Sequence, residues 1–159
     1  MPKRSQQEIE QLYQRHVNTV YRVCYAHMKQ PAEAEDAVQD TFIKLMRANP
    51  HLADVCHEKA WLIRTAGNVC KDMLRRRRRR ELPLEDDLPG GAFLHENNTV
   101  LQAVLALPGK YKTVVVLYYY EGYNSAEIAR LLRKPGATVR GHLHEARKLL
   151  KLQLGGELD

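Results

Sequence analysis

The chain has 159 residues, with 25 Lys and Arg against 19 Asp and Glu, a net charge of +6 and an isoelectric point near 9.3. This basic balance predicts a polyanionic partner, nucleic acid above all. No apolar run approaches the roughly 20 residues of a membrane-spanning helix, and no apolar stretch follows the basic N-terminal residues, so we expect a cytoplasmic protein without membrane insertion.

The first 80 residues predict three helices. Apolar side chains recur every three or four positions over residues 6–29, over residues 32–47 and from about Glu58 into the arginines that end at Arg80. Pro31 separates the first two helices, and Asn49-Pro50 ends the second. The pattern therefore predicts a small all-helical domain.

The second of these helices carries an acidic surface within a basic half of the chain. Its apolar face uses Ala34, Val38 and Leu45, which leaves Asp36, Gln39 and Asp40 on the other sides. Carboxylates repel DNA, so a functional interpretation requires a protein partner. On pattern alone, an ordinary solvated helix face is the favoured interpretation.

The third helix joins one tryptophan to many cations. Trp61, Arg64, Lys71 and the run Arg75 to Arg80 predict contacts with phosphates, which give salt-sensitive affinity with little sequence preference. Trp61 has two interpretations, a core anchor, which is favoured, or a platform on which an unstacked base rests. The arginine run could also be a solvated helix end or the start of a linker.

A linker is predicted over residues 81–96. Residues 81–98 hold five acidic and no basic side chains. Residues 1–80 hold 16 basic and 9 acidic side chains, and residues 99–159 hold 9 basic and 5 acidic ones. Two prolines and a Gly-Gly pair make residues 81–96 unsuited to regular structure. The domains predicted are therefore residues 1–80 and 97–159.

The second domain opens with a short helix and an ambiguous apolar run. Residues 97–107 predict a helix that ends at Pro108-Gly109, with five side chains facing inward: Val100, Leu101, Val104, Leu105 and Leu107. Residues 111–120, YKTVVVLYYY, favour a strand by propensity. We expect a helix, because a lone strand among helices would leave its backbone unpaired.

Residues 124–151 have the pattern of a helix-turn-helix. A helix from Ser125 to about Leu132, capped at Asn124-Ser125, is followed by a break at Arg133-Lys134-Pro135-Gly136 and then by a second helix. Both helices carry apolar stripes that let them cross and pack. An amphipathic hairpin without a binding role is the alternative. Eight other side chains of the second helix are predicted to face outward, several of them at spacings that could meet a DNA groove: Thr138, Arg140, His142, His144, Glu145, Arg147, Lys148 and Lys151.

Signatures of catalysis and metal binding are missing. The sequence has no Gly-rich phosphate loop, nucleophile elbow or zinc-protease motif. Cys24, Cys56 and Cys70 are too widely spaced for a zinc motif or a disulfide framework and predict reduced thiols; a metal site at Cys56-His57 with His51 is the weaker alternative. We expect no enzymatic activity, no cofactor and no metal.

Three segments together resemble the extracytoplasmic-function (ECF) group of the sigma-70 family of bacterial RNA polymerase sigma factors. AEAEDAVQDTFIKLM at 32–46 resembles the region-two segment that docks on the polymerase clamp, and KAWLIRTAGNVCKDMLRR at 59–76 resembles the promoter-melting segment. YNSAEIARLLRKPGATVRGHLHEARKLLK at 123–151 resembles the region-four helix-turn-helix. The resemblance implies two small all-helical domains and a helix over residues 111–120.

For region two, the resemblance implies two surfaces. It makes Asp36, Gln39, Asp40 and Phe42 contacts or supports for the clamp, which promotes the acidic surface to a functional one. It implies that the loop from Asn49 to Glu58 captures a flipped base of the minus-ten element. Together with the cations above, the residues expected at promoter DNA are Trp61, Arg64, Asn68, Lys71, Arg75 and Arg76.

For region four, the resemblance implies recognition of the minus-thirty-five element. The residues expected there are Thr138, Arg140, Gly141, His142, His144, Arg147 and Lys148. The chain departs from the family at Ala137, where Gly is usual, at Gly141, where Ser is usual, and at His142 and Glu145, where basic residues are common. Gly67 stands where Arg is frequent in region two, so the departures predict weaker phosphate contacts.

The function predicted is that of a sigma factor with core RNA polymerase and promoter DNA as partners and an anti-sigma factor as a further candidate partner. One alternative is a stand-alone helix-turn-helix regulator that binds an operator without polymerase. Another is an anti-sigma-like adaptor that binds polymerase or a sigma factor and never touches DNA.

Overall fold

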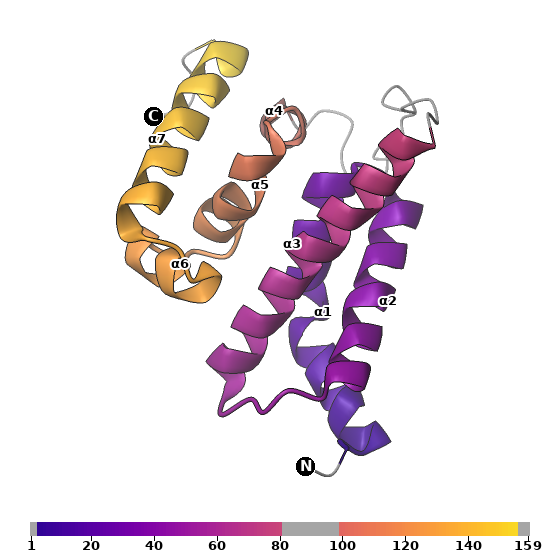
Figure 1. Cartoon of the computed structure of the whole chain (residues 1–159). Coiled ribbons are helices and arrows are strands. Elements are labelled where there is room, and N and C mark those ends of the chain that lie inside the picture. The colour runs from indigo at the N-terminus through magenta and orange to yellow at the C-terminus, as the bar shows by residue number, and fades with distance from the viewer. Residues whose placement is uncertain (1–2, 81–98, 156–159) are drawn as a thin grey trace. The chain divides into compact units, whose positions relative to one another are not determined.

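The computed structural model describes residues 3–80 and 99–155, and every regular element in these ranges is a helix (Figure 1). The predicted all-α class is therefore confirmed. The chain divides into two compact units, Met1–Leu84 and Glu85–Asp159. Residues 81–96, predicted to be a linker, lie outside the described residues. No helix in the described part of the chain has the length and apolar character needed to cross a membrane.

The first unit is a bundle of three helices, α1 (Gln6–Met28), α2 (Pro31–Ala48) and α3 (Val55–Arg79), each packed on the other two (Figure 1). α1 and α2 end within two residues of the predicted positions. α3 begins three residues before Glu58, because the side chain of Asp54 caps it by accepting a hydrogen bond of 2.8 Å from the backbone N–H of His57.

The other helix ends follow from local sequence. Ser5 and Glu8 form a capping box that begins α1, in which each side chain accepts a hydrogen bond of 3.1 Å from the other residue's backbone N–H. Pro31 occupies the first turn of α2, where a missing N–H costs nothing. Asn49 ends α2 with φ of 43°, a left-handed conformation that asparagine tolerates.

The core of the first unit contains two cysteines. Cys24 on α1 and Cys70 on α3 are both completely buried, whereas Cys56 is exposed. A hydrogen bond with Cys70, reinforced by burial, raises the pKa of the Cys24 thiol. All three cysteines are free thiols. The two buried cysteines therefore act as small apolar residues between helices.

The second unit consists of α4 (Thr99–Leu105), α5 (Gly109–Val115), the π-helix η2 (Val116–Tyr120), α6 (Ser125–Leu132) and α7 (Gly136–Leu154). α7 packs against α4, α5 and α6. Buried residues from α4, α5 and α7 form the core of this unit, among them Val104, Val115, Ala146 and Leu150.

The apolar run at residues 111–120 is helical, as predicted, although its second half widens into a π-turn. The backbone N–H of Glu121 donates to the carbonyl of Val116, five residues earlier, at 3.1 Å. Packing on α7 therefore overrides the strand propensity of Val and Tyr. One expectation for α4 is wrong, because Val100 is 41% exposed and Leu101 is only partly buried.

Candidate functional site

The outer face of α2 carries the predicted acidic surface. Asp36, Gln39 and Asp40 are exposed. Phe42, in contrast, is only 5% exposed, and its ring packs on the ring of Tyr13 from α1 with a centroid separation of 4.9 Å. Phe42 therefore supports this face from beneath and does not itself offer a contact.

Apolar side chains extend this face, and sequence analysis missed them. Ile43 and Met46 are 37% and 46% exposed, and Tyr13 is 41% exposed. Ile43 lies three residues after Asp40, and Met46 lies three residues after Ile43, so each is a neighbour of the one before it on the helix surface. Their position off the apolar stripe of α2 was a signal available in the sequence.

A groove of about 360 Å³ joins the acidic face of α2 to the arginine run of α3. Asp36, Gln39 and Asp40 of α2 line it together with Arg76, Arg77 and Arg80 at the end of α3, and Met28 and Met73 complete the lining. Arg77 forms an ion pair with Glu33 of α2. The acidic surface and part of the arginine run are therefore walls of one groove.

The predicted DNA-binding residues of α3 share one stripe. Trp61, Arg64, Asn68, Lys71 and Arg75 follow one another at steps of three or four residues, which places them along one side of a helix. The last three are exposed, whereas Trp61 and Arg64 are partly buried. Trp61 is thus neither fully in the core nor fully a surface platform.

Two details modify this stripe. Arg75 pairs with Asp72 at 2.9 Å on the exposed surface, an arrangement worth little in water, and Arg76 lines the groove toward α2. Gly67 lies one turn from both Arg64 and Lys71, and nothing approaches within 4 Å of the position that a Cβ there would take. There is room at Gly67 for the arginine that the resemblance leads one to expect.

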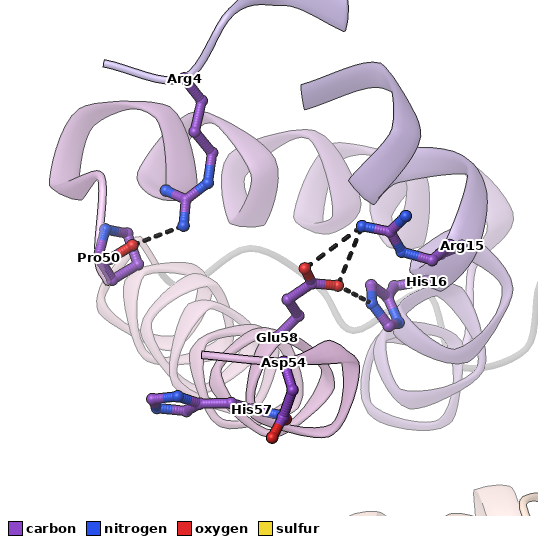
Figure 2. A network of polar contacts seen from close by, with 7 residues as sticks. All are labelled: Arg4, Arg15, His16, Pro50, Asp54, His57 and Glu58. Atoms are coloured by element: carbon purple, nitrogen blue, oxygen red, sulfur yellow. Dashed lines mark hydrogen bonds and ion pairs between the residues drawn. The ribbon is translucent and has the colours of Figure 1, made fainter. Parts of the chain in front are cut away.

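Polar contacts hold the loop between α2 and α3, residues 49–54, at both ends (Figure 2). Arg4 donates to Asn49 Oδ1 at 3.0 Å and to the carbonyl of Pro50 at 2.6 Å. At the other end, Nδ1 of His57 accepts the backbone N–H of Ala53 at 3.1 Å. The resemblance implies base capture by Asn49 to Glu58, a stretch that includes this loop, but nothing in the sequence indicates Arg4, which lies 45 residues from Asn49.

His57 is thereby tied to the loop, and the weaker metal alternative gains no support. No group of three His, Cys, Asp or Glu side chains that could hold a metal ion occurs within residues 3–80 and 99–155. Cys56 and His51 are both exposed.

The helix-turn-helix is formed by α6 and α7. Asn124 begins α6 with a capping box in which its side chain accepts the backbone N–H of Glu127 at 2.8 Å. Arg133 turns the chain with φ of 55°, and Pro135 leads into α7. Of the predicted apolar stripes, Ile128 on α6 and Val139, Leu143, Ala146 and Leu150 on α7 are buried. Ala146 and Leu150 lie in the core shared with α4 and α5, and Ala129 and Leu132 are only partly buried.

The exposed side of α7 carries most of the predicted recognition residues. Five of them are exposed: Thr138, Arg140, Gly141, His144 and Lys148. Arg140 lies over the first turn, since a Cβ added at Gly136 would meet its Nη1 at 3.0 Å. These residues form a polar and basic surface along the helix.

His142 differs from the prediction because it turns toward the core. It is only partly exposed, and its ring meets the ring of Tyr111 edge-on with centroids 5.4 Å apart. Its buried Nδ1 has no hydrogen-bond partner. Desolvation, together with Lys134 and Lys110, lowers the pKa of His142 below 6.5. His142 is therefore less readily protonated than an ordinary histidine and supplies less charge for phosphate.

Arg147 is also only partly exposed, because Tyr119 of η2 holds it. Its Nε donates to the Tyr119 hydroxyl at 3.4 Å. Sequence analysis missed Tyr119, since YKTVVVLYYY shows no helical period that would choose one tyrosine over another.

Comparison with known families covers both units. Residues 12–80 match the model for sigma-70 region 2, and residues 97–150 match a model for sigma-70 region 4. The first match contains α2, α3 and the groove, and the second contains the helix-turn-helix.

Individual proteins agree with these matches. The chain is 32% identical to the ECF RNA polymerase sigma factor SigM of Bacillus subtilis, over 90% of this chain and 93% of SigM. It is 30% identical to SigW of the same organism, over 85% of this chain and 82% of SigW. In fold it is similar to the sigma factor RpoE in complex with the anti-sigma factor NepR from Bartonella quintana, with a TM-score of 0.71, 18% identity and coverage of 94% of this chain and 98% of that one.

Proposed function

The chain belongs to the ECF group of the sigma-70 family of RNA polymerase sigma factors, and on that premise we propose which of its residues meet the polymerase and which meet DNA. As an ECF sigma factor it binds core RNA polymerase and directs promoter recognition and transcription initiation. Residues 12–80, before the helix-turn-helix, match sigma-70 region 2, and this match supports a sigma factor over a stand-alone regulator.

Each of the two units corresponds to one proposed domain. Residues 1–80 form the region-two domain, residues 81–96 the linker and residues 97–159 the region-four domain. The protein works in the cytoplasm as an initiation factor without catalytic activity of its own. An anti-sigma factor that covers the same surfaces would hold it inactive.

The exposed face of α2 is the polymerase-binding surface. Asp36, Gln39 and Asp40 supply charge and hydrogen bonds, and Ile43 and Met46 supply apolar area beside them. Phe42, packed on Tyr13, keeps this face in place. Carboxylates next to exposed apolar side chains suit a basic and partly apolar protein surface.

The outer stripe of α3 is the surface for the melted minus-ten region. Asn68, Lys71 and Arg75 are exposed along it, and Trp61 and Arg64 continue it toward the loop at residues 49–54. The cations attract phosphates and the indole stacks on a base. Opening then draws its free energy from the capture of unstacked bases, without any bond-making step.

The exposed side of α7 reads the minus-thirty-five element through the major groove. Thr138 and Arg140 lie in its first turns, where a recognition helix meets base edges, and His144 and Lys148 follow. Arg147 contacts the phosphate backbone. His142 packs on Tyr111 and supports the helix.

The observation that carries this proposal is a basic helical stripe on each unit, together with an acidic face on α2 that DNA would avoid. Its test is transcription in vitro by holoenzyme that carries Arg140→Ala or Lys71→Ala. Arg140→Ala should weaken transcription only from promoters with an intact minus-thirty-five element, and Lys71→Ala should slow opening at all promoters. Lys151→Ala, also on α7, is the control; equal behaviour of all three variants would refute the assignments.

A further inference from the structure

The π-turn η2 changes which tyrosines face solvent. In a continued α-helix, residues four apart share a face. Here Val115 is completely buried and Tyr119 is 41% exposed, and Val116 is 2% exposed while Tyr120 is 42% exposed. The wider turn, closed by the bond from Glu121 N–H to Val116, therefore moves both tyrosines out of the core.

Only one of these two tyrosines reaches α7 with its hydroxyl. The Tyr119 hydroxyl accepts a hydrogen bond from Arg147 Nε at 3.4 Å. The ring of Tyr118 meets the ring of Tyr119 edge-on, with centroids 5.0 Å apart, and fixes its orientation. The hydrogen bond with Tyr119 also raises the pKa of Arg147, with a smaller contribution from Tyr118.

Arg147 donates to Tyr119 through Nε and not through a terminal nitrogen of the guanidinium. A guanidinium carries five N–H groups in a planar fork, and a bond through Nε fixes that plane while its two terminal nitrogens keep donors for another acceptor. A side chain ordered before binding loses less conformational entropy when it meets a phosphate. Tyr119 therefore prepares Arg147 for a ligand with planar or paired oxygen acceptors.

We propose that Tyr119 is a positioning residue that holds the Arg147 guanidinium ready for a phosphate of the upstream promoter DNA. This inference rests on the proposed contact between Arg147 and DNA. Tyr119 acts through Arg147 and does not itself touch the phosphate.

The test is a double-mutant cycle with Tyr119→Phe and Arg147→Ala in holoenzyme, measured as affinity for a promoter fragment at several salt concentrations. Tyr119→Phe keeps the ring and removes only the hydroxyl, and it should weaken binding by about threefold to tenfold. Arg147→Ala should weaken it at least as much and reduce the salt slope by about one. The double variant should bind like Arg147→Ala alone.

Tyr120→Phe is the matched control. It removes a hydroxyl from the neighbouring tyrosine, of similar exposure, and should bind as the wild type does. The unfolding midpoint of Tyr119→Phe should also stay within about 3 °C of the wild type, because one exposed hydroxyl contributes little to stability. If Tyr119→Phe loses affinity for promoter DNA while its unfolding midpoint is unchanged, the loss shows that Tyr119 positions Arg147.

The outcomes separate this inference from the proposed function. If Arg147→Ala has no effect, the DNA contact of Arg147 is wrong and the role of Tyr119 falls with it. If Arg147→Ala weakens binding and Tyr119→Phe does not, the DNA contact stands and the positioning role is overturned. If the two effects add, Tyr119 touches DNA independently, which also overturns the positioning role.

Discussion

Nε2 of His16 lies 3.0 Å from Oε1 of Glu58, so a buried side chain of α1 is joined to the first turn of α3 (Figure 2). Arg15 approaches the same carboxylate at 3.2 Å. The side chain of His16 is 4% exposed and that of Glu58 is 14% exposed. This contact fixes the start of α3 close to the loop that we assign to base capture.

Replacement of Glu58 by alanine should destabilise the first unit by about 1–3 kcal/mol, because the buried ring of His16 loses its partner. Arg15→Ala removes only the more exposed contact and should cost less than about 1 kcal/mol. Urea unfolding followed by circular dichroism measures both. Equal and small losses would show that the His16 contact contributes nothing.

Reversal of charge at Asp36 and Asp40, as Asp36→Lys with Asp40→Lys, should abolish binding to core polymerase, because both carboxylates are exposed on the proposed contact face. Glu35→Lys, also exposed on α2, is the control and should bind nearly normally. Fluorescence anisotropy of the labelled chain with core polymerase measures binding. Normal affinity of the double variant, with unchanged helix content, would remove this assignment.

Gly67→Arg should strengthen promoter binding, since the position is open and lies one turn from Arg64 and Lys71. One further contact with a phosphate of the melted strand should steepen the dependence of log affinity on log salt by about 0.7. Gly67→Ala is the matched control, because it shares the gain in helix propensity of roughly 1 kcal/mol without the charge. The same salt slope for both variants would mean that position 67 does not face DNA.

Local signals predicted most of the helices. The apolar periods gave α1 and α2 to within two residues, and Asn124 with the break at residues 133–136 gave the helix-turn-helix. The helical form of residues 111–120 needed tertiary reasoning, since Val and Tyr alone favour a strand. The start of α3 was missed because Asp54 was not recognised as its cap.

The candidate site was harder to predict because it depends on contacts between distant residues. Nothing in the spacing of His142 indicates that its ring turns toward Tyr111, 31 positions earlier. The ion pair of Arg77 with Glu33 and the bond of Arg147 with Tyr119 likewise require knowledge of how helices pack. Exposure of Ile43 and Met46 could have been read from the helical period of α2.

The lowered pKa of His142 predicts that the stability of the fold depends on pH. Around pH 6.5 the folded chain binds fewer protons at this ring than the unfolded chain, so stability rises with pH there. The contribution of His142 to the free energy of unfolding is fully present above the pKa of its ring in the unfolded chain. It is lost as the pH falls through the lower pKa of the ring in the folded chain. The unfolding midpoint of the wild type should therefore fall more between about pH 7.5 and pH 5.5 than that of His142→Phe, which keeps a ring against Tyr111.

An NMR titration of the His142 ring protons provides the independent check. A midpoint below 6.5 agrees with the buried, unpartnered nitrogen. A midpoint at or above 6.5, or equal pH dependence of the two proteins, would place the ring in solvent and restore His142 to the DNA-facing surface.

The most direct test of the central claim, that two helical units read a promoter only on the polymerase, is footprinting of promoter DNA with the purified chain, with and without core RNA polymerase. The account predicts protection of both the minus-ten and the minus-thirty-five elements when core polymerase is present, and no specific protection by the chain alone. Specific protection of a site by the chain alone, or no protection with core polymerase, would contradict it.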